Sequence, residues 1–392
     1  MKKIFTLAAA GVLAAGALGA QAQVTLDGQL TAPEVTAGNY VLLGKYTNPR
    51  GFGDAGLLSL YAASTATKLY IFVGGTLEAN GNAFQLYMDL PATPGVPIGT
   101  ALPAGAATTS FEKVTAKLDM AADLALAVRS EGTTGYQIEG AAYTSATVGS
   151  SAKLTTTAAP VLSSGAPLSL SPTTTIGEYA RLTGARISYR VAAMPGISNN
   201  PGNTTPNTGA SYGGVGSYGW EIELDRTAAG LVGTPAVTLF VIQNGGDGGY
   251  MSTDFIPQTS APLPAMTNSG NLATGAFDFT TLPDRQAATI ALGTGGVTLG
   301  TKAADAAALA VGVYPNPANG VATVAYNVGS RSENVNIALT DLLGRQVQVL
   351  ANGIQPAGVQ SKVVSTANVA AGTYLVRVQV GDKVATRKVM VL

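Results

Sequence analysis

Near its C-terminal end the chain reads Tyr374-Leu375-Val376-Arg377-Val378-Gln379-Val380, in which apolar and mostly polar side chains alternate. A period of two is typical of a β-strand with one buried face. Gly381-Asp382 then offers a tight turn into residues 384–392, so this stretch predicts a β-hairpin. A second hairpin is predicted over 335–350, because Asp341 and Gly344 occupy the first and last positions of a type I turn.

Three sequence blocks occur in order over the last eighty or so residues. They read Val313-Tyr314-Pro315-Asn316-Pro317-Ala318, Asp341-Leu342-Leu343-Gly344-Arg345 and Ala371-Gly372-Thr373-Tyr374-Leu375-Val376-Arg377. This series resembles the C-terminal type A sorting domain of the type IX secretion system of Bacteroidetes, over residues 311–392. The resemblance implies a small Ig-like β-sandwich, export to the cell surface or the medium, and the secretion machinery as a partner.

The residues that carry this sorting motif are Tyr314, Pro315, Asn316, Pro317, Asp341, Gly344, Arg345, Gly372 and Tyr374. Pro315 and Pro317 cannot donate hydrogen bonds to a ladder, so we expect them at the start of the domain and not inside a strand. The alternative is an ordinary β-sandwich appended for stability. Three spaced blocks in order favour the sorting domain.

The N-terminal end is typical of a secretory signal peptide over residues 1–22. Lys2 and Lys3 precede an apolar run, 4–18, and Ala20-Gln21-Ala22 is a small-residue cleavage site. The apolar run is too short for the alternative, a membrane-spanning helix, and no later stretch of about 20 apolar residues follows. We therefore expect Sec export to the periplasm, then passage to the cell surface or beyond, with no transmembrane segment in the mature chain.

The composition predicts an all-β protein. Glycine accounts for 49 of 392 residues and charged residues for only 11%, which favours many short strands joined by turns. Without cysteine, no disulfide can hold the fold. Without a concentrated basic face, nucleic acid is excluded as a partner. We predict an antiparallel β-sandwich body with long loops over 23–300, a linker at 301–310 and the sorting domain at 311–392.

Within the body, strands are predicted in pairs. Residues 68–73 and 83–89 are expected to form one antiparallel pair, and 125–129 and 136–143 another. Further strands are expected at 185–191, 218–225 and 236–243. The intervening low-complexity segments 91–105, 155–175, 195–216 and 259–275 are expected to be surface loops.

The body also resembles family 9 carbohydrate-binding modules and the wider DOMON-like group of β-sandwiches. The matching stretches are Thr25-Leu26-Asp27-Gly28, Leu69-Tyr70-Ile71-Phe72-Val73-Gly74-Gly75, Leu86-Tyr87-Met88-Asp89, Tyr218-Gly219-Trp220-Glu221-Ile222-Glu223-Leu224-Asp225 and Leu239-Phe240-Val241-Ile242-Gln243-Asn244. The resemblance implies an extracellular glycan as the candidate ligand. The candidate binding residues are Tyr87, Asp89, Trp220, Glu221, Glu223 and Asp225.

The strongest candidate for chemistry is the alternating set Glu221, Glu223 and Asp225. Alternation places all three on one face of a strand, and paired carboxylates are what glycoside hydrolysis requires. The same pattern describes a half-buried strand with one solvated face, which is the interpretation we favour. Because the chain has no histidine, a Ser-His triad and the commonest general base are excluded. No catalytic residue is assigned.

A glycine-rich turn around residues 244–250 suggests a second kind of site. Asn244, Asp247 and Asp254 carry oxygen ligands of the type that Ca²⁺ prefers, although a plain β-turn explains the same residues more simply. The sequence as a whole predicts an exported, non-catalytic β-sandwich with glycan as its candidate ligand. The alternatives are a secreted carboxylate-dependent glycan hydrolase and a structural surface or matrix protein.

Overall fold

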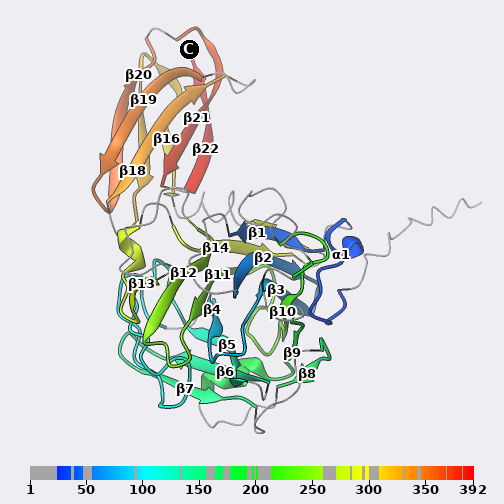
Figure 1. Cartoon of the computed structure of the whole chain (residues 1–392). Helices are drawn as coiled ribbons and strands as arrows, with labels where there is room; N and C mark the ends of the chain where they lie inside the picture. Colours follow the sequence, from blue (N-terminus) through cyan, green and yellow to red (C-terminus); the bar gives the residue numbers. More distant parts are fainter. Residues whose placement is uncertain are drawn as a thin grey trace, which may run out of the picture.

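The computed structural model is built almost entirely of β-strands (Figure 1). It describes residues 24–392 except 37–38, 47–54, 92–94, 133–134, 156–163, 171–176, 192–196, 198–199, 202–212, 259–270, 283–284, 294–295, 300–308, 330–331, 342–345, 368 and 382. The predicted signal peptide at 1–22, most of the linker, and Gly344 and Arg345 of the sorting motif lie outside these residues.

The first sheet of the body has six strands in the order β1-β2-β3-β10-β9-β8. Its members are β1 (Val41–Lys45), β2 (Gly56–Ser64), β3 (Lys68–Thr76), β8 (Leu168–Ser169), β9 (Arg186–Tyr189) and β10 (Gly219–Asp225). All neighbouring pairs are antiparallel.

The second sheet of the body has nine strands, seven of them in the order β13-β12-β11-β4-β5-β6-β7, with β14 and β15 added beside β11. The members are β4 (Ala83–Asp89), β5 (Leu124–Ser130), β6 (Tyr136–Tyr143), β7 (Gly149–Lys153), β11 (Ala236–Asn244), β12 (Tyr250–Ile256), β13 (Asn271–Thr274), β14 (Ala288–Leu292) and β15 (Val297–Leu299). The body is therefore one β-sandwich.

The two sheets enclose a large apolar core that contains Ile71 of β3, Trp220 and Ile222 of β10, Leu86 of β4 and Val241 of β11. Along β10 the side chains alternate between this core and the outer face, as the sequence pattern predicts. The single tryptophan is fully buried here, so Trp220 is a core residue and not an exposed ligand-binding residue.

The outer face of each sheet is covered by a segment of the chain itself. The N-terminal segment 24–40, with the short helix α1 (Ala32–Thr36), packs Leu30 and Tyr40 against Tyr61 and Phe72 of the first sheet. Glu34 ties α1 to the residue before it, since Glu34 Oε2 accepts hydrogen bonds from the Thr31 backbone N–H at 2.9 Å and from its hydroxyl at 2.7 Å.

The second sheet is covered by residues 95–122 and by the segment around the short 3₁₀ helix Phe279–Thr281. Phe111 and Phe279 pack there on Tyr87 and Phe240 of the strands. A further 3₁₀ helix, Gly177–Leu182, places buried Tyr179 against β6, where its hydroxyl donates to the Gly140 carbonyl at 2.9 Å. The prediction of a surface loop at 91–105 is partly wrong, because Val96 and Leu102 are buried in the apolar cluster between the second sheet and the segment that covers it.

The C-terminal strands form a separate β-sandwich, drawn in yellow to red in Figure 1. Its order is β19-β18-β21-β22-β16-β17-β20. The strands are β16 (Gly312–Asn319), β17 (Val321–Asn327), β18 (Glu333–Thr340), β19 (Gln346–Gln355), β20 (Val359–Ser365), β21 (Gly372–Val380) and β22 (Lys383–Val391).

Three of the predicted hairpins are present and one is not. The pairs β5–β6, β18–β19 and β21–β22 are antiparallel as expected. The predicted pair 68–73 with 83–89 is wrong: β3 pairs with β2 and β10, and β4 pairs with β5 and β11 in the other sheet. The turn at Asn80-Gly81-Asn82 thus connects the two sheets instead of closing a hairpin.

The expectation for the two prolines is also corrected. Pro315 and Pro317 lie inside β16, the first strand of the C-terminal sandwich. The ladder between β16 and β17 is interrupted between Tyr314 and Asn319. This interruption accommodates residues that lack a backbone donor.

Candidate functional site

Glu221 lies in the middle of β10 with no exposed surface. Its Oε2 accepts hydrogen bonds from the backbone N–H groups of Asp27 at 2.9 Å and Gly28 at 3.0 Å. Its Oε1 accepts the hydroxyl of Tyr40 at 2.6 Å. All three donors belong to the covering segment 24–40, so this carboxyl anchors that segment to the sheet.

The turn under Glu221 depends on a glycine. Gly28 has a φ of +70°, and a Cβ there would lie 2.6 Å from the backbone nitrogen of Arg190. Only glycine adopts this conformation at so close an approach. The Asp27-Gly28 turn and the acidic strand β10 are therefore in direct contact.

Burial raises the pKa of Glu221 to about 8, while the hydrogen bonds from Tyr40, Gly28 and Asp27 act in the opposite direction. The group therefore does not bring a full negative charge into the interior at neutral pH. A raised pKa is also a feature of catalytic acids. Here, however, both oxygens are occupied by the covering segment.

Glu223 lies two residues further along β10 and has 2% of its surface exposed. Arg186 of β9 holds it through two hydrogen bonds, from Nε at 2.9 Å and Nη2 at 2.5 Å, and Lys68 Nζ lies 3.6 Å away. Burial alone would raise the pKa of Glu223, but the hydrogen bonds and charge of Arg186, with Lys68, lower it. Asp225 at the strand end accepts from the backbone of Thr227 and Ala228 at 3.0 Å each.

The three carboxylates thus share a face, as predicted, but the face is not solvated. The interpretation of a wet face is wrong for Glu221 and Glu223, because segment 24–40 and the Arg186 side chain cover them. No sequence pattern indicates this cover, because residues 24–40 contain no long apolar run.

The remaining candidate binding residues do not join this site. Tyr87 is fully buried under the other cover, where its hydroxyl donates to Gln85 Oε1 at 2.6 Å. Asp89 lies half-buried at the end of β4, where burial raises its pKa against the opposing charge of Arg285.

The second cover uses the same kind of anchor, which sequence reasoning missed. Glu139 of β6 is fully buried and accepts the backbone N–H of Ser110 at 2.6 Å, with Arg129 Nε at 2.9 Å. Asp123 accepts the N–H of Leu90 at 2.6 Å, and Asp119 accepts that of Gln286 at 2.5 Å. Buried acids in this body therefore serve to hold covering segments and loops.

The residues proposed for calcium do not meet at one point. Asn244 Nδ2 donates to Gln85 Oε1 at 2.6 Å on the outer side of the second sheet. Asp254 points to the inner side, where Oδ2 accepts the Leu57 N–H at 3.3 Å. Asp247 is an exposed partner of Lys113. Among the described residues, no three acidic side chains gather in a metal-binding group.

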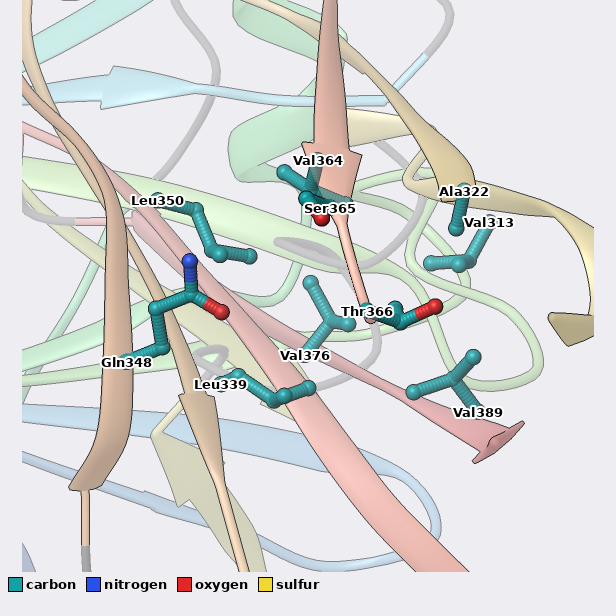
Figure 2. Close-up of a pocket in the computed structure, with 10 residues that line it drawn as sticks. All are labelled: Val313, Ala322, Leu339, Gln348, Leu350, Val364, Ser365, Thr366, Val376 and Val389. Carbon is teal, nitrogen blue, oxygen red and sulfur yellow. The ribbon is translucent and has the colours of Figure 1, made fainter. Parts of the chain in front are cut away.

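A small hollow lies between the two layers of the C-terminal sandwich (Figure 2). Its lining is Val313, Ala322, Leu339, Gln348, Leu350, Val364, Ser365, Thr366, Val376 and Val389. None of these side chains titrates near neutral pH, so the hollow cannot support acid–base catalysis.

Most of the described residues of the sorting motif lie on β16 and β21. Asn316 ties β16 to β22, since Nδ2 donates to the Lys388 carbonyl at 2.9 Å and Oδ1 accepts the Met390 N–H at 2.9 Å. Tyr374 donates to the Ala370 carbonyl at 2.9 Å, two residues before Gly372. Tyr314 is 56% exposed. Asp341 follows β18 directly, at the start of the β18–β19 connection.

Comparison with known families identifies the C-terminal part. Residues 312–392 match the family described as the secretion system C-terminal sorting domain. No curated protein sequence matches the chain. The chain therefore carries a type IX sorting domain at its C-terminal end, which marks it for export to the cell surface or the medium and implies interaction with the type IX machinery.

Solved structures show only distant similarity. Dimeric latent PorU from Porphyromonas gingivalis is 11% identical with a TM-score of 0.20, covering 90% of this chain and 34% of PorU. PorZ, a surface component of the type IX secretion system of the same organism, is 12% identical with a TM-score of 0.16, covering 84% and 45%. The FN1–FN3 domains of chicken CNTN1 are 9% identical with a TM-score of 0.18, covering 88% and 99%.

The chain thus spans about a third of PorU and less than half of PorZ. At these TM-scores the similarities carry no argument about function.

In the described part of the chain, no helix has the length and hydrophobicity needed to cross a membrane.

Proposed function

We propose that this chain is a passenger of the type IX secretion system whose β-sandwich body acts outside the cell by binding or display and not by catalysis. The observation that carries the proposal is the sorting domain at residues 312–392. The body in front of it is the cargo that this domain would deliver.

The use of the acidic side chains supports a non-catalytic body. The most suggestive pair, Glu221 and Glu223, is occupied by the Asp27-Gly28 turn, Tyr40 and Arg186. A catalytic carboxyl needs access to its substrate. The alternative of a carboxylate-dependent hydrolase would require segment 24–40 to leave its place.

Glycan remains the candidate ligand, through loops and strand ends. The sheet faces are covered by 24–40 and 95–122, and within the described part of the body every aromatic residue is at least partly buried. Sugar platforms usually rest on exposed aromatic rings. A glycan would therefore be held mainly by hydrogen bonds, with weak affinity.

The test is incubation of the secreted protein with an array of insoluble and soluble polysaccharides. Co-sedimentation with one class, competed by its soluble form and absent for heat-denatured protein, would support binding. No binding at all would favour display over recognition. Release of reducing sugars from any polysaccharide would contradict the proposal, and its loss in Glu221→Gln would then identify β10 as catalytic.

A further inference from the structure

Asn316 of the sorting motif makes a two-point contact with the last strand of the chain. Its Nδ2 donates to the Lys388 carbonyl at 2.9 Å, and its Oδ1 accepts the Met390 N–H at 2.9 Å. Two residues further along β16, the Ala318 carbonyl accepts the Leu392 N–H at 2.9 Å. These contacts lie along one edge of β22, which is parallel to β16 where the two strands pair (Figure 1).

The contacts follow the hydrogen-bond pattern of a parallel ladder. In such a pair, a residue donates to the residue before its partner and accepts from the residue after it. Ala318 is paired with Val391 and accepts from Leu392. The Asn316 carboxamide continues the same pattern around Val389, with its side-chain N–H and C=O in place of backbone groups.

The neighbouring prolines explain why a side chain makes this contact. Pro315 and Pro317 have no N–H to donate, and the ladder from β16 to β17 is interrupted between Tyr314 and Asn319. The asparagine between the prolines supplies a donor and an acceptor, as a peptide group does. Its carboxamide therefore closes a ladder that the backbone of this segment leaves open.

The strand that Asn316 holds joins the two layers of the C-terminal sandwich. β22 pairs with β21 along its nine residues, and β16 covers its other edge. Because β16 also pairs with β17, it links the layer of β17 and β20 to the layer of β18, β19, β21 and β22. Val389 and Val391 of β22 are buried. Separation of β16 from β22 would open the sandwich at this edge.

We propose that Asn316 is a positioning residue of the sorting domain: it fixes β22 in the closed sandwich, and the secretion machinery recognises the domain only in this form. This role rests on the proposed function, since it concerns how the sorting domain is recognised. Both ends of the carboxamide are occupied within the domain. Asn316 therefore acts through β22 and not by contact with the machinery.

Full-length variants made in a type IX-competent host give two measurements, which are release from the cell and backbone hydrogen exchange of the purified protein. Asn316→Ala removes both contacts. We expect the Met390 amide to exchange about tenfold faster, because two hydrogen bonds together change an opening equilibrium by about this factor, and release to fall by a similar factor. Asn319→Ala, at the exposed end of the same strand, is the matched control and should change neither.

Asn316→Asp tests the contact apart from any general loss of stability. At pH 7 the carboxylate has no hydrogen to donate to the Lys388 carbonyl, so the Met390 amide should exchange faster than in the unchanged chain and release should fall. A protonated carboxyl restores the donor, and the difference in exchange should disappear below the ordinary aspartate pKa of about 3.9. β16 and β17 carry no charged residue, and the cations of β22, Lys383, Arg387 and Lys388, shift this recovery to lower pH. Asn316→Ala should keep its difference at every pH, and if it does not fold, the acid recovery of Asn316→Asp decides.

Three results would overturn the role of Asn316. They are unchanged Met390 exchange in folded Asn316→Ala, normal release despite faster exchange, and a failure of Asn316→Asp to recover in acid. Deletion of residues 311–392 distinguishes the two proposals. A retained deletion variant together with normally released Asn316→Ala would reject only the role of Asn316, whereas release of the deletion variant would reject the sorting function itself.

Discussion

The body and the C-terminal sandwich use the same alternating strands in opposite ways. In the body, alternating acids on β10 are buried, because segment 24–40 lies over them. In the C-terminal sandwich, valines on β19 in one layer and on β20 in the other are exposed, because no described segment covers the outer faces of these layers. Alternation therefore reports which residues share a face, and the rest of the chain decides whether that face meets water.

The two regions also differ in how their polar and apolar side chains are used. A body covered on both faces has its polar groups committed to internal anchors such as Glu221 and Glu139. The small C-terminal domain instead leaves valine side chains on its outer faces exposed, as at Val359 and Val363. This difference is consistent with a body that must stay folded and a sorting domain that the secretion machinery must recognise.

The largest effect on stability is expected from Glu221→Leu. The substitution leaves the N–H groups of Asp27 and Gly28 and the Tyr40 hydroxyl without their acceptor. Each buried donor without a hydrogen-bond partner costs about 1–3 kcal/mol. We expect the free energy of unfolding to fall by about 3–5 kcal/mol. Urea denaturation measures it, and a loss below about 1 kcal/mol, the size of an ordinary surface change, would show that segment 24–40 is not anchored here.

The pH dependence of the free energy of unfolding should reflect the buried Glu221 carboxyl. The folded-state pKa of Glu221, about 8, lies above the ordinary 4.5, so the folded protein holds a proton that the unfolded chain has released. This stabilisation is complete below pH 4.5 and is lost as the pH rises to about 8. Glu221→Gln should unfold with a shallower dependence of the melting temperature on pH across this window, and an unchanged slope in that variant would contradict the assignment.

A smaller effect of opposite sign is expected from Glu223→Gln. Arg186 lowers the pKa of Glu223 below its ordinary value, so its contribution is present above pH 4.5 and is lost as the pH falls. Because Arg186 is partly exposed, we expect a loss of only about 1 kcal/mol at pH 7. Melting curves at pH 7 and pH 3 measure it, and an equal loss at both would exclude the ion pair as its cause.

The smallest effect is expected at the exposed valines of the C-terminal sandwich. Val359→Thr should change the free energy of unfolding by no more than about 0.5 kcal/mol, because most of the side chain is already in water. Val324→Thr on the neighbouring strand is the matched buried control, and should cost about 1–3 kcal/mol. Equal losses would mean that the outer layer is covered in solution.

Much of the fold follows from local sequence, and the site does not. The hairpins β18–β19 and β21–β22 and the sharing of one face by Glu221 and Glu223 depend on alternation and turn residues only a few positions apart. The wrong pairing of 68–73 with 83–89 arose because Asn80-Gly81-Asn82 suits a hairpin and a crossing between sheets equally well. The burial of Glu221 depends on Gly28 and Tyr40, more than 180 residues away, and no periodicity reports such contacts.

Expression of the chain without residues 311–392 in a type IX-competent host tests most directly whether the C-terminal sandwich directs export. We predict that the truncated protein keeps a folded, protease-resistant body and accumulates in the periplasm, while the full-length chain reaches the surface or the medium. Release of the truncated protein at the full-length level would show that this C-terminal sandwich is not the export signal.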